Sequence, residues 1–122
     1  MRVYVTGWDG LLGSALVLAL RAHGHEVSGM SVVDADITDT AFLRDRLGAF
    51  RPDCVVHLAA MTAVDRCETE PEEAFRVNEI GSRAAAEEAQ RVNAAVLALS
   101  TDYVFDGAKR SPYTEDDAPA PL

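Results

Sequence analysis

Residues 1–14 read MRVYVTGWDGLLGS, and in them an apolar run, Val3–Thr6, leads directly into three evenly spaced glycines, Gly7, Gly10 and Gly13. This pattern predicts a strand, a tight turn and the start of a helix, because glycine lets the backbone bend sharply and lets a phosphate approach it. The amides that open such a helix, together with its dipole, attract negative charge. The spacing Gly-x-x-Gly-x-x-Gly is a variant of the dinucleotide fingerprint Gly-x-Gly-x-x-Gly, so we expect a dinucleotide site at this turn.

The remainder of the chain alternates short apolar stretches with segments of helical periodicity. We expect further strands at residues 26–30, 54–60 and 94–99 and helices at 11–23 and 71–92. Between them, Asp39 or Thr40 can cap a further helix that ends before Pro52. The first helix should bury a stripe made of Leu11, Leu12, Ala15, Leu16, Ala19 and Leu20. Residues 61–70 and 100–122 read as loops. The alternation predicts an α/β fold with a doubly wound parallel sheet of Rossmann type.

Composition excludes several classes of function. The 122 residues suit one domain, and none of the apolar runs is long enough to span a membrane. A net charge of −9 argues against binding to nucleic acid or to an anionic membrane through a basic surface. The N-terminus lacks the layout of a signal peptide, and Cys54 and Cys67 lack metal-type spacing. We therefore expect a cytoplasmic protein without a metal site and without nucleic acid or a membrane as its partner.

Ligands of a doubly wound sheet bind at the carboxyl ends of its strands, which directs the search for site residues. The second strand is followed by Ser31. The first acidic residue after this strand is Asp34, and no arginine lies nearby in the sequence. An acid at the strand end would repel a ribose 2′-phosphate, so the sequence tolerates NADP and leaves NAD or NADP open as the cofactor. Asp36 can accept a hydrogen bond from an adenine amino group while Ile37 packs on the ring, and Asp36 or Asp39 can equally cap the next helix.

Three segments near the ends of the last two strands carry a family resemblance. They read AAMTAVD at residues 59–65, STDYVFDG at 100–107 and PYTEDD at 112–117. Together they closely resemble the dTDP-4-dehydrorhamnose reductases, which belong to the extended short-chain dehydrogenases/reductases. The resemblance covers nearly the whole chain and implies a Rossmann-type domain that binds NADP or NAD. It further implies an enzyme that reduces a 4-keto dTDP-sugar, dTDP-4-dehydrorhamnose, to dTDP-L-rhamnose.

The resemblance assigns roles to residues at matching positions. It implies cofactor-binding residues in the pyrophosphate loop, the adenine pair and the strand ends: Gly7, Gly10, Leu11, Leu12, Gly13, Asp36, Ile37, Ala59, Ala60, Met61 and Ser100. Met61 departs from the family, which more often has tyrosine at this position. Thr101 matches the hydroxyl of the catalytic triad, which hydrogen-bonds the substrate carbonyl. The substrate-binding positions match Asp102, Tyr103 and Val104, and Asn78 matches a buried helical asparagine with a structural role.

The chain departs from the family at the proton donor. The family delivers a proton from a tyrosine, and a lysine four residues later lowers the pKa of that tyrosine by its charge. No tyrosine of this chain is followed by lysine at that spacing. We therefore interpret residues 1–122 as the N-terminal part of a dinucleotide-binding domain that is cut after its fourth strand, with the remaining strands and the substrate domain absent.

Other interpretations stay open. One is a short natural protein that keeps only the nucleotide-binding half. Another is a non-catalytic regulatory subunit that resembles the beta subunit of methionine adenosyltransferase. A nucleotide-sugar epimerase or dehydratase is a third, although the Ser-Thr-Asp-Tyr string fits those enzymes less well. In such a fragment the last strand would present an apolar edge, which invites aggregation or a partner. For the parent protein we expect a homodimer.

Overall fold

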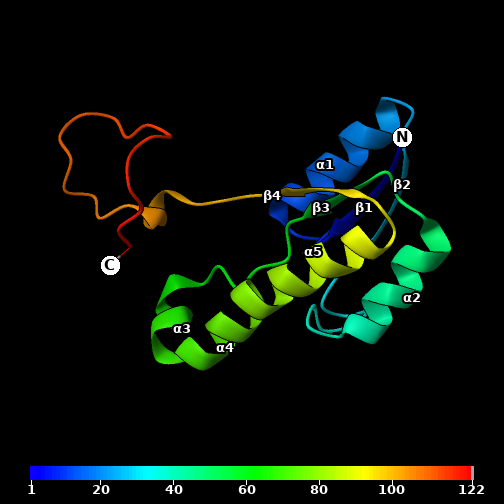
Figure 1. The fold of residues 1–122 in the computed structure, drawn as a ribbon, viewed down its shortest axis with the longest axis horizontal. Helices are drawn as coiled ribbons and strands as arrows, with labels where there is room; N and C mark the ends of the chain where they lie inside the picture. The colour runs from blue at the N-terminus through cyan, green and yellow to red at the C-terminus, as the bar shows by residue number, and fades with distance from the viewer. Residues whose placement is uncertain (122) are drawn as a thin grey trace.

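The computed structural model describes residues 1–121 and confirms the doubly wound parallel sheet (Figure 1). Its strands are β1 (Arg2–Thr6), β2 (Glu26–Met30), β3 (Cys54–His57) and β4 (Ala95–Ala98). They pair in parallel in the order β2-β1-β3-β4, with Val5 of β1 opposite Gly29 and Val56. The chain passes from β2 on one side of β1 to β3 on the other, so β1 and β3 form the switch point where ligands of such sheets bind.

The helical segments differ from the expected ones after β3. They are α1 (Leu11–Ala22), α2 (Thr40–Phe50), α3 (Val64–Thr69), α4 (Pro71–Phe75), the π-helical η1 (Arg76–Ile80), α5 (Gly81–Arg91) and the short 3₁₀ helix η2 (Asp102–Val104). Residues 64–69, expected to be a loop, form α3, and the single helix expected at 71–92 is divided by η1. β3 ends at His57 instead of residue 60, because the amides of Leu58 and Ala59 turn to the Thr6 hydroxyl. Among residues 1–121, no helix combines the length and the apolarity that a membrane crossing requires.

The two faces of the sheet pack against different helices. Val3, Val5 and Val56 form one cluster with Val17 of α1. Tyr4 belongs to a second cluster on the side of α2 and α5, together with Met30, Ile37, Leu43, Leu47, Val55, Ala84 and Ala89. This alternation along β1 is the period of two that a strand covered on both faces requires. Burial raises the pKa of Tyr4 to about 12, so its hydroxyl stays neutral across the physiological range.

Helix α1 buries only part of the stripe expected, because Leu16 and Leu20 pack against the cluster of β1 and β3 whereas Leu11 and Leu12 do not. Leu11 and Leu12 are 98% and 49% exposed, whereas the buried positions are Gly13 and Val17. The helix is apolar around most of its circumference, so periodicity alone does not define which side turns inward. Its rotation is instead set by Gly13, whose backbone lies so close to Gly7 that a side chain there would collide with it.

Strand β4 lies in an apolar stretch of the kind found in buried strands, but it is exposed along its whole length. Val96 and Leu97 keep 43% and 50% of their surface accessible. Within residues 1–121 the strand pairs only with β3, while α1 packs on β1 and β2 at the other end of the sheet. In Figure 1 the chain after β4 runs away from the sheet, which leaves this strand as the apolar edge that the sequence indicated.

Charge pairing joins α2 to α5 at a buried carboxylate. Glu88 is 3% exposed and accepts hydrogen bonds from Nε and Nη2 of Arg44 at 3.1 and 2.9 Å. Arg91 donates to the same carboxylate at 3.1 Å. The hydrogen bond from Arg44, followed by the charges of both arginines, holds the pKa of Glu88 below its usual range.

Replacing Glu88 with glutamine should destabilise the protein at neutral pH by about 2 kcal/mol, because Arg44 and Arg91 lose their anionic partner. The pKa of Glu88 is lower in the folded chain than its ordinary value of 4.5, so its contribution is fully present above pH 4.5 and is lost as the pH falls through the folded pKa. Urea unfolding from neutral to acidic pH measures both effects. The exposed neighbour Glu87→Gln is the matched control, and an equal loss in the two variants would contradict the expectation.

A methyl group at Gly13 should prevent α1 from docking on the sheet. An added Cβ would lie 2.1 Å from the Gly7 carbonyl oxygen and 2.8 Å from the Trp8 backbone, so we expect Gly13→Ala to cost at least about 3 kcal/mol. Gly48→Ala in α2 is the control, because nothing lies within 4 Å of that methyl group. Alanine there should stabilise the helix by about 0.5–1 kcal/mol. Similar urea midpoints for the two variants would show that Gly13 does not limit the packing of α1.

Candidate functional site

A cavity of about 370 Å³ opens at the carboxyl ends of β1, β2 and β3. It is lined by the glycine turn, by residues that follow β2 and β3, and by side chains of the segment from α3 to η1. Its volume lies within the range of small-molecule sites, about 300–1,000 Å³. The cavity therefore occupies the crevice that the strand order predicts.

The glycine turn lies against the backbone at the end of β2 and in the loop after β3. Gly7 is left-handed, with φ of 67°, and an added Cβ would lie 2.9 Å from the Ala59 amide nitrogen. Its own amide donates to the Met30 carbonyl at 2.8 Å. Gly10 then begins α1 without a capping side chain, so the amides of the first helical turn are available to an anion.

The Thr6 hydroxyl, at the end of β1, connects this strand to the loop after β3. It lies 2.9 Å from His57 Nδ1 and accepts hydrogen bonds from the amides of Leu58 and Ala59 at 3.1 and 3.2 Å. Both Thr6 and His57 are buried. These bonds bend the chain out of β3 and place residues 58–61 beside the cavity.

The hydrogen bonds of His57 define one arrangement of protons. Ser82 donates its hydroxyl proton to the Asn78 carbonyl at 2.5 Å, so its 3.0 Å contact with His57 Nε2 requires a proton on that nitrogen. Burial lowers the pKa of His57 below its ordinary value, which keeps the ring neutral at physiological pH. His57 Nδ1 therefore accepts the Thr6 proton, and the Thr6 oxygen is left to accept the two loop amides.

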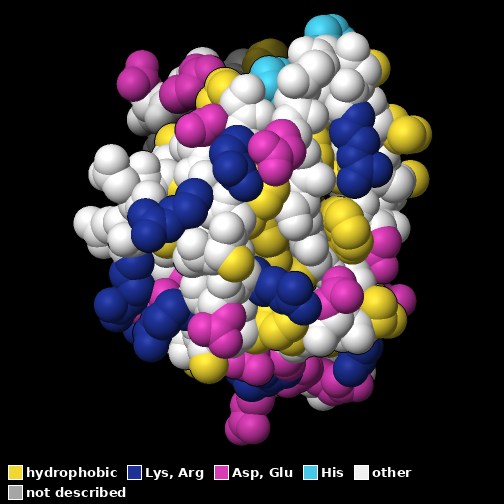
Figure 2. All heavy atoms as spheres, turned by 90° about the vertical axis from the view of Figure 1, so that its right-hand side faces the viewer, with side chains coloured by type: hydrophobic (Ala, Val, Ile, Leu, Met, Phe, Trp, Pro, Cys, Tyr) yellow, Lys and Arg dark blue, Asp and Glu magenta, His cyan; other side chains and the backbone are white. Residues whose placement is uncertain are grey.

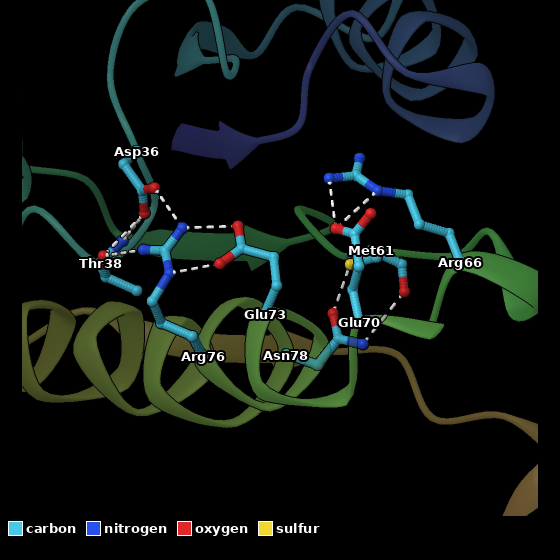
Figure 3. Close-up of polar contacts among 8 residues, drawn as sticks. All are labelled: Asp36, Thr38, Met61, Arg66, Glu70, Glu73, Arg76 and Asn78. Atoms are coloured by element: carbon cyan, nitrogen blue, oxygen red, sulfur yellow. Dashed lines mark hydrogen bonds and ion pairs between the residues drawn. The ribbon is translucent and has the colours of Figure 1, made fainter. Parts of the chain in front are cut away.

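Asn78 holds the end of the same loop from the helical side (Figure 3). Its Oδ1 accepts from the Met61 amide at 2.7 Å, and its Nδ2 donates to the Met61 carbonyl at 3.0 Å. The side chain performs the structural role expected from the sequence, but Asn78 is exposed instead of buried. Asn78 and Arg76 both belong to η1, and π-helical turns of this kind are frequent at functional sites.

Asp36 forms an ion-pair cluster beside the cavity (Figure 3). Its Oδ1 accepts from the amide and hydroxyl of Thr38 at 2.8 and 2.7 Å, and its Oδ2 accepts from Arg76 at 2.7 Å. Arg76 also donates to both oxygens of Glu73, at 2.8 and 2.7 Å. The hydrogen bonds from Arg76 and then Thr38 hold the pKa of Asp36 far below its usual range. Of the candidate caps of α2, Asp39 is the one that forms the cap.

The structure brings together most of the cofactor-binding residues expected from the sequence. The cavity is lined by Gly7, Gly10, Asp36, Ile37, Ala59, Ala60 and Met61. Leu11, Leu12 and Gly13 form the first turn of α1 and do not line the cavity. Ile37 is 6% exposed and its side chain lies against Gly81, so it forms part of the cavity wall and does not project from it.

The residues expected at the substrate lie apart from this cavity. Ser100 and Thr101 follow β4 and are exposed. The Thr101 hydroxyl accepts from the Tyr103 amide at 3.3 Å and caps η2, which also contains Asp102 and Val104. The assignment of Ser100 to the cofactor, Thr101 to catalysis and the η2 residues to the substrate stays a prediction.

Sequence reasoning missed the arginines of the cavity. Arg66 and Arg76 both line it, although no arginine stands near the end of β2 in the sequence. Arg66, in α3, donates to Glu70 at 3.0 and 2.8 Å (Figure 3). Both arginines come from the helical segment after β3, and only the folding of the chain brings them to the residues that follow β2. No local motif marks either one.

The described residues form neither a metal site nor, on the face of Figure 2, a basic surface. Among residues 1–121, the His, Cys, Asp and Glu side chains form no group of three or more that could hold a metal ion. On the face shown in Figure 2, lysine and arginine side chains are interspersed with acidic and hydrophobic ones. That face therefore offers no continuous basic surface to a polyanion.

The strand order, the left-handed glycine and the cavity at the switch point define this chain as a Rossmann-type α/β domain. The model of one protein family, described as the RmlD substrate binding domain, matches residues 1–122. The chain belongs to this family, which confirms the resemblance found in its sequence.

Individual relatives support membership of this family. The dTDP-4-dehydrorhamnose reductase of Streptomyces griseus is 43% identical over 120 residues, which are 98% of this chain and 40% of the relative. The crystal structure of a dTDP-4-dehydrorhamnose reductase from Clostridium acetobutylicum matches with a TM-score of 0.94 at 37% identity, over 99% of this chain and 43% of that one. The Bacillus anthracis enzyme, solved in complex with NADP, matches with a TM-score of 0.93 at 36% identity, over 98% and 43%. The chain thus spans less than half the length of these relatives.

Removing the Thr6 hydroxyl should loosen the loop after β3. Thr6→Val keeps the shape of the side chain but leaves His57 Nδ1 and the Ala59 amide without a partner, while the Leu58 amide keeps the Thr6 carbonyl, at an expected cost of about 2–3 kcal/mol. Thr6→Ser keeps the hydroxyl and should lose only about 1 kcal/mol for the missing methyl group. Denaturant unfolding measures the difference, and hydrogen exchange should show faster exchange at Leu58 and Ala59 in the valine variant alone. Equal stability and equal exchange in both variants would remove Thr6 from this role.

Proposed function

We propose that the protein containing this chain reduces a 4-keto dTDP-sugar with NADPH or NADH, converting dTDP-4-dehydrorhamnose to dTDP-L-rhamnose, and that this chain carries the cofactor-binding half. The glycine turn is the observation that carries the proposal, because Gly7 leaves no room for a side chain beside the loop after β3. A bare backbone next to an uncapped helix start suits a pyrophosphate. The reductases among its relatives support the substrate class.

The residues present fit a dinucleotide along the length of the cavity. Gly7, Gly10 and the first amides of α1 would hold the pyrophosphate, and residues 59–61 would pass below the adjoining ribose. Ile37 would lie at the adenine ring. Asp36 would accept from the adenine amino group, and its depressed pKa keeps it an ionised acceptor at physiological pH. When bound, the nicotinamide supplies a hydride to the carbonyl carbon of the sugar.

Thr101 would act on the carbonyl oxygen. Its hydroxyl would donate a hydrogen bond that orients and stabilises this oxygen as negative charge develops there. Asp102, Tyr103 and Val104, which follow it, would lie on the substrate side. An acid must also deliver a proton to the oxygen, and this chain contains no Tyr-x-x-x-Lys pair to do so. The proposal therefore makes residues 1–122 the N-terminal part of a longer reductase, with the proton donor, the later strands and the substrate domain beyond them.

The same proposal extends to the partners of the protein and to its cellular compartment. The exposed apolar side chains of β4 require cover, which later strands of the full-length chain would supply, and the parent protein would associate as a homodimer. Its partner in the reaction is a small nucleotide sugar. A reductase that draws on pools of reduced nicotinamide and nucleotide sugar works in the cytoplasm.

A non-catalytic, nucleotide-binding regulatory subunit is the second candidate. One observation favours it, since the Thr101 hydroxyl is engaged as the cap of η2. Such a protein would bind the cofactor in the same cavity and turn nothing over. The two candidates are therefore separated by turnover, and binding alone does not distinguish them.

The test incubates the full-length protein with dTDP-4-dehydrorhamnose and either NADPH or NADH. We expect oxidation of the nicotinamide, followed by its absorbance, together with formation of dTDP-L-rhamnose. Thr101→Val should keep cofactor affinity and lose at least about a hundredfold in kcat, whereas Thr101→Ser should retain most of it. Cofactor binding without any turnover in the wild type would instead establish the regulatory subunit.

The cofactor assignment has its own control. Gly10→Asp should weaken binding of either dinucleotide at least about tenfold, because a carboxylate would face the pyrophosphate and the added Cβ lies 3.2 Å from the Gly7 carbonyl oxygen. Gly10→Ala introduces the same Cβ without the charge and should weaken binding less. If Gly10→Asp binds as tightly as the wild type, the pyrophosphate does not lie at this turn.

A further inference from the structure

The end of β2 is where a Rossmann site distinguishes NADH from NADPH, because the residues there lie beside the adenosine ribose. In this chain Ser31 and Val32 follow β2, and both line the cavity. Ser31 is buried, whereas Val32 is 85% exposed. The charges and free donors around these two residues therefore decide whether a ribose 2′-phosphate is accepted.

The Asp34 carboxylate is hydrogen-bonded to Ser31. Oδ2 of Asp34 accepts from the Ser31 amide at 2.7 Å and from its hydroxyl at 3.3 Å, while the Asp34 amide donates to the Ser31 carbonyl at 3.0 Å. This turn fixes the negative charge of Asp34 at the strand end, although the residue stands three positions further along the chain. It also engages the amide and the hydroxyl of Ser31, so neither is free to donate to a phosphate.

The cations of the cavity are already paired. Arg76 forms ion pairs with both Asp36 and Glu73, and Arg66 forms one with Glu70. Two carboxylates around a single guanidinium leave the surroundings of Arg76 with net negative charge. A 2′-phosphate would add about two further negative charges to the ligand. It would meet neither an unpaired arginine on the cavity nor a free donor on Ser31.

We propose that Asp34 is a specificity-determining residue and that the site binds NADH in preference to NADPH. The inference rests on the proposed function, since it concerns a nicotinamide dinucleotide in this cavity. Asp34 acts through its charge and through its hold on Ser31, and Val32 supplies no cation to oppose it. The Bacillus anthracis relative was solved with NADP, so the preference belongs to the residues that this chain carries after β2.

Titration of the full-length protein with NADH and NADPH at low salt, followed by nicotinamide fluorescence, tests the proposal. The wild type should bind NADH at least about fivefold more tightly than NADPH, the effect of one exposed like-charge contact. Asp34→Asn keeps an oxygen for the Ser31 amide and should tighten NADPH about fivefold with NADH unchanged. Asp45→Asn is the matched control, because it removes an exposed carboxylate of α2 that, unlike Asp34, is not bonded to the cavity-lining Ser31.

A second pair of variants adds a cation. Val32→Arg should shift the ratio of affinities toward NADPH at least about fivefold. Val33→Arg places the same charge at a residue that is 86% exposed but does not line the cavity, and it should leave the ratio unchanged. Wild-type affinity for NADPH equal to or above that for NADH would overturn the preference, as would equal shifts within either pair. Failure to bind both dinucleotides would instead refute the proposed function.

Discussion

The hydroxyl of Thr6 is the point on which the arrangement of the site depends. It stands at the end of the central strand, between the glycine turn that follows it in sequence and the loop after β3 that it holds in space. Because it gives its proton to His57, its oxygen accepts two amides, and His57 in turn donates to Ser82 on the helical side. One uncharged chain of hydrogen bonds thus fixes three segments around the cavity, with each donor matched to an acceptor.

The fold could be predicted from the sequence because its signals are local. An apolar strand followed by Gly7, and later strands that alternate with helices, suffice to define a doubly wound sheet. The rotation of α1 could not be predicted, since the helix is apolar on most sides and a contact between Gly13 and Gly7 decides which side turns inward. The apolar edge at β4 was expected from the sequence, but the exposure of its side chains along the whole strand was not. The hydrophobic pattern of a segment indicates that it can be buried. It does not indicate whether another element is present to cover it.

The same distinction applies to the candidate site. The glycine turn, residues 59–61 and Asp36 could be located because each follows a strand, and the ends of parallel strands meet at one edge of the sheet. Arg76 could not, because it reaches the site from a π-helical segment inside a sequence that reads as one continuous helix, and Asn78 in the same segment was indicated only by the family resemblance. The effect of Asp34 was also hidden, since the distance along the chain does not reveal the turn that binds it back onto the end of β2.

These contacts explain how a chain with a net charge of −9 can offer a site to the proposed anionic cofactor. At the glycine turn, the groups that would meet the pyrophosphate are backbone amides and a helix start, supported by a neutral His57, so the attraction needs no side-chain charge. Where charged side chains do reach the cavity, Arg66 and Arg76 are held by carboxylates. The attraction for an anion is therefore short-range and confined to the turn. Elsewhere the excess of carboxylates limits how much further negative charge the ligand can carry.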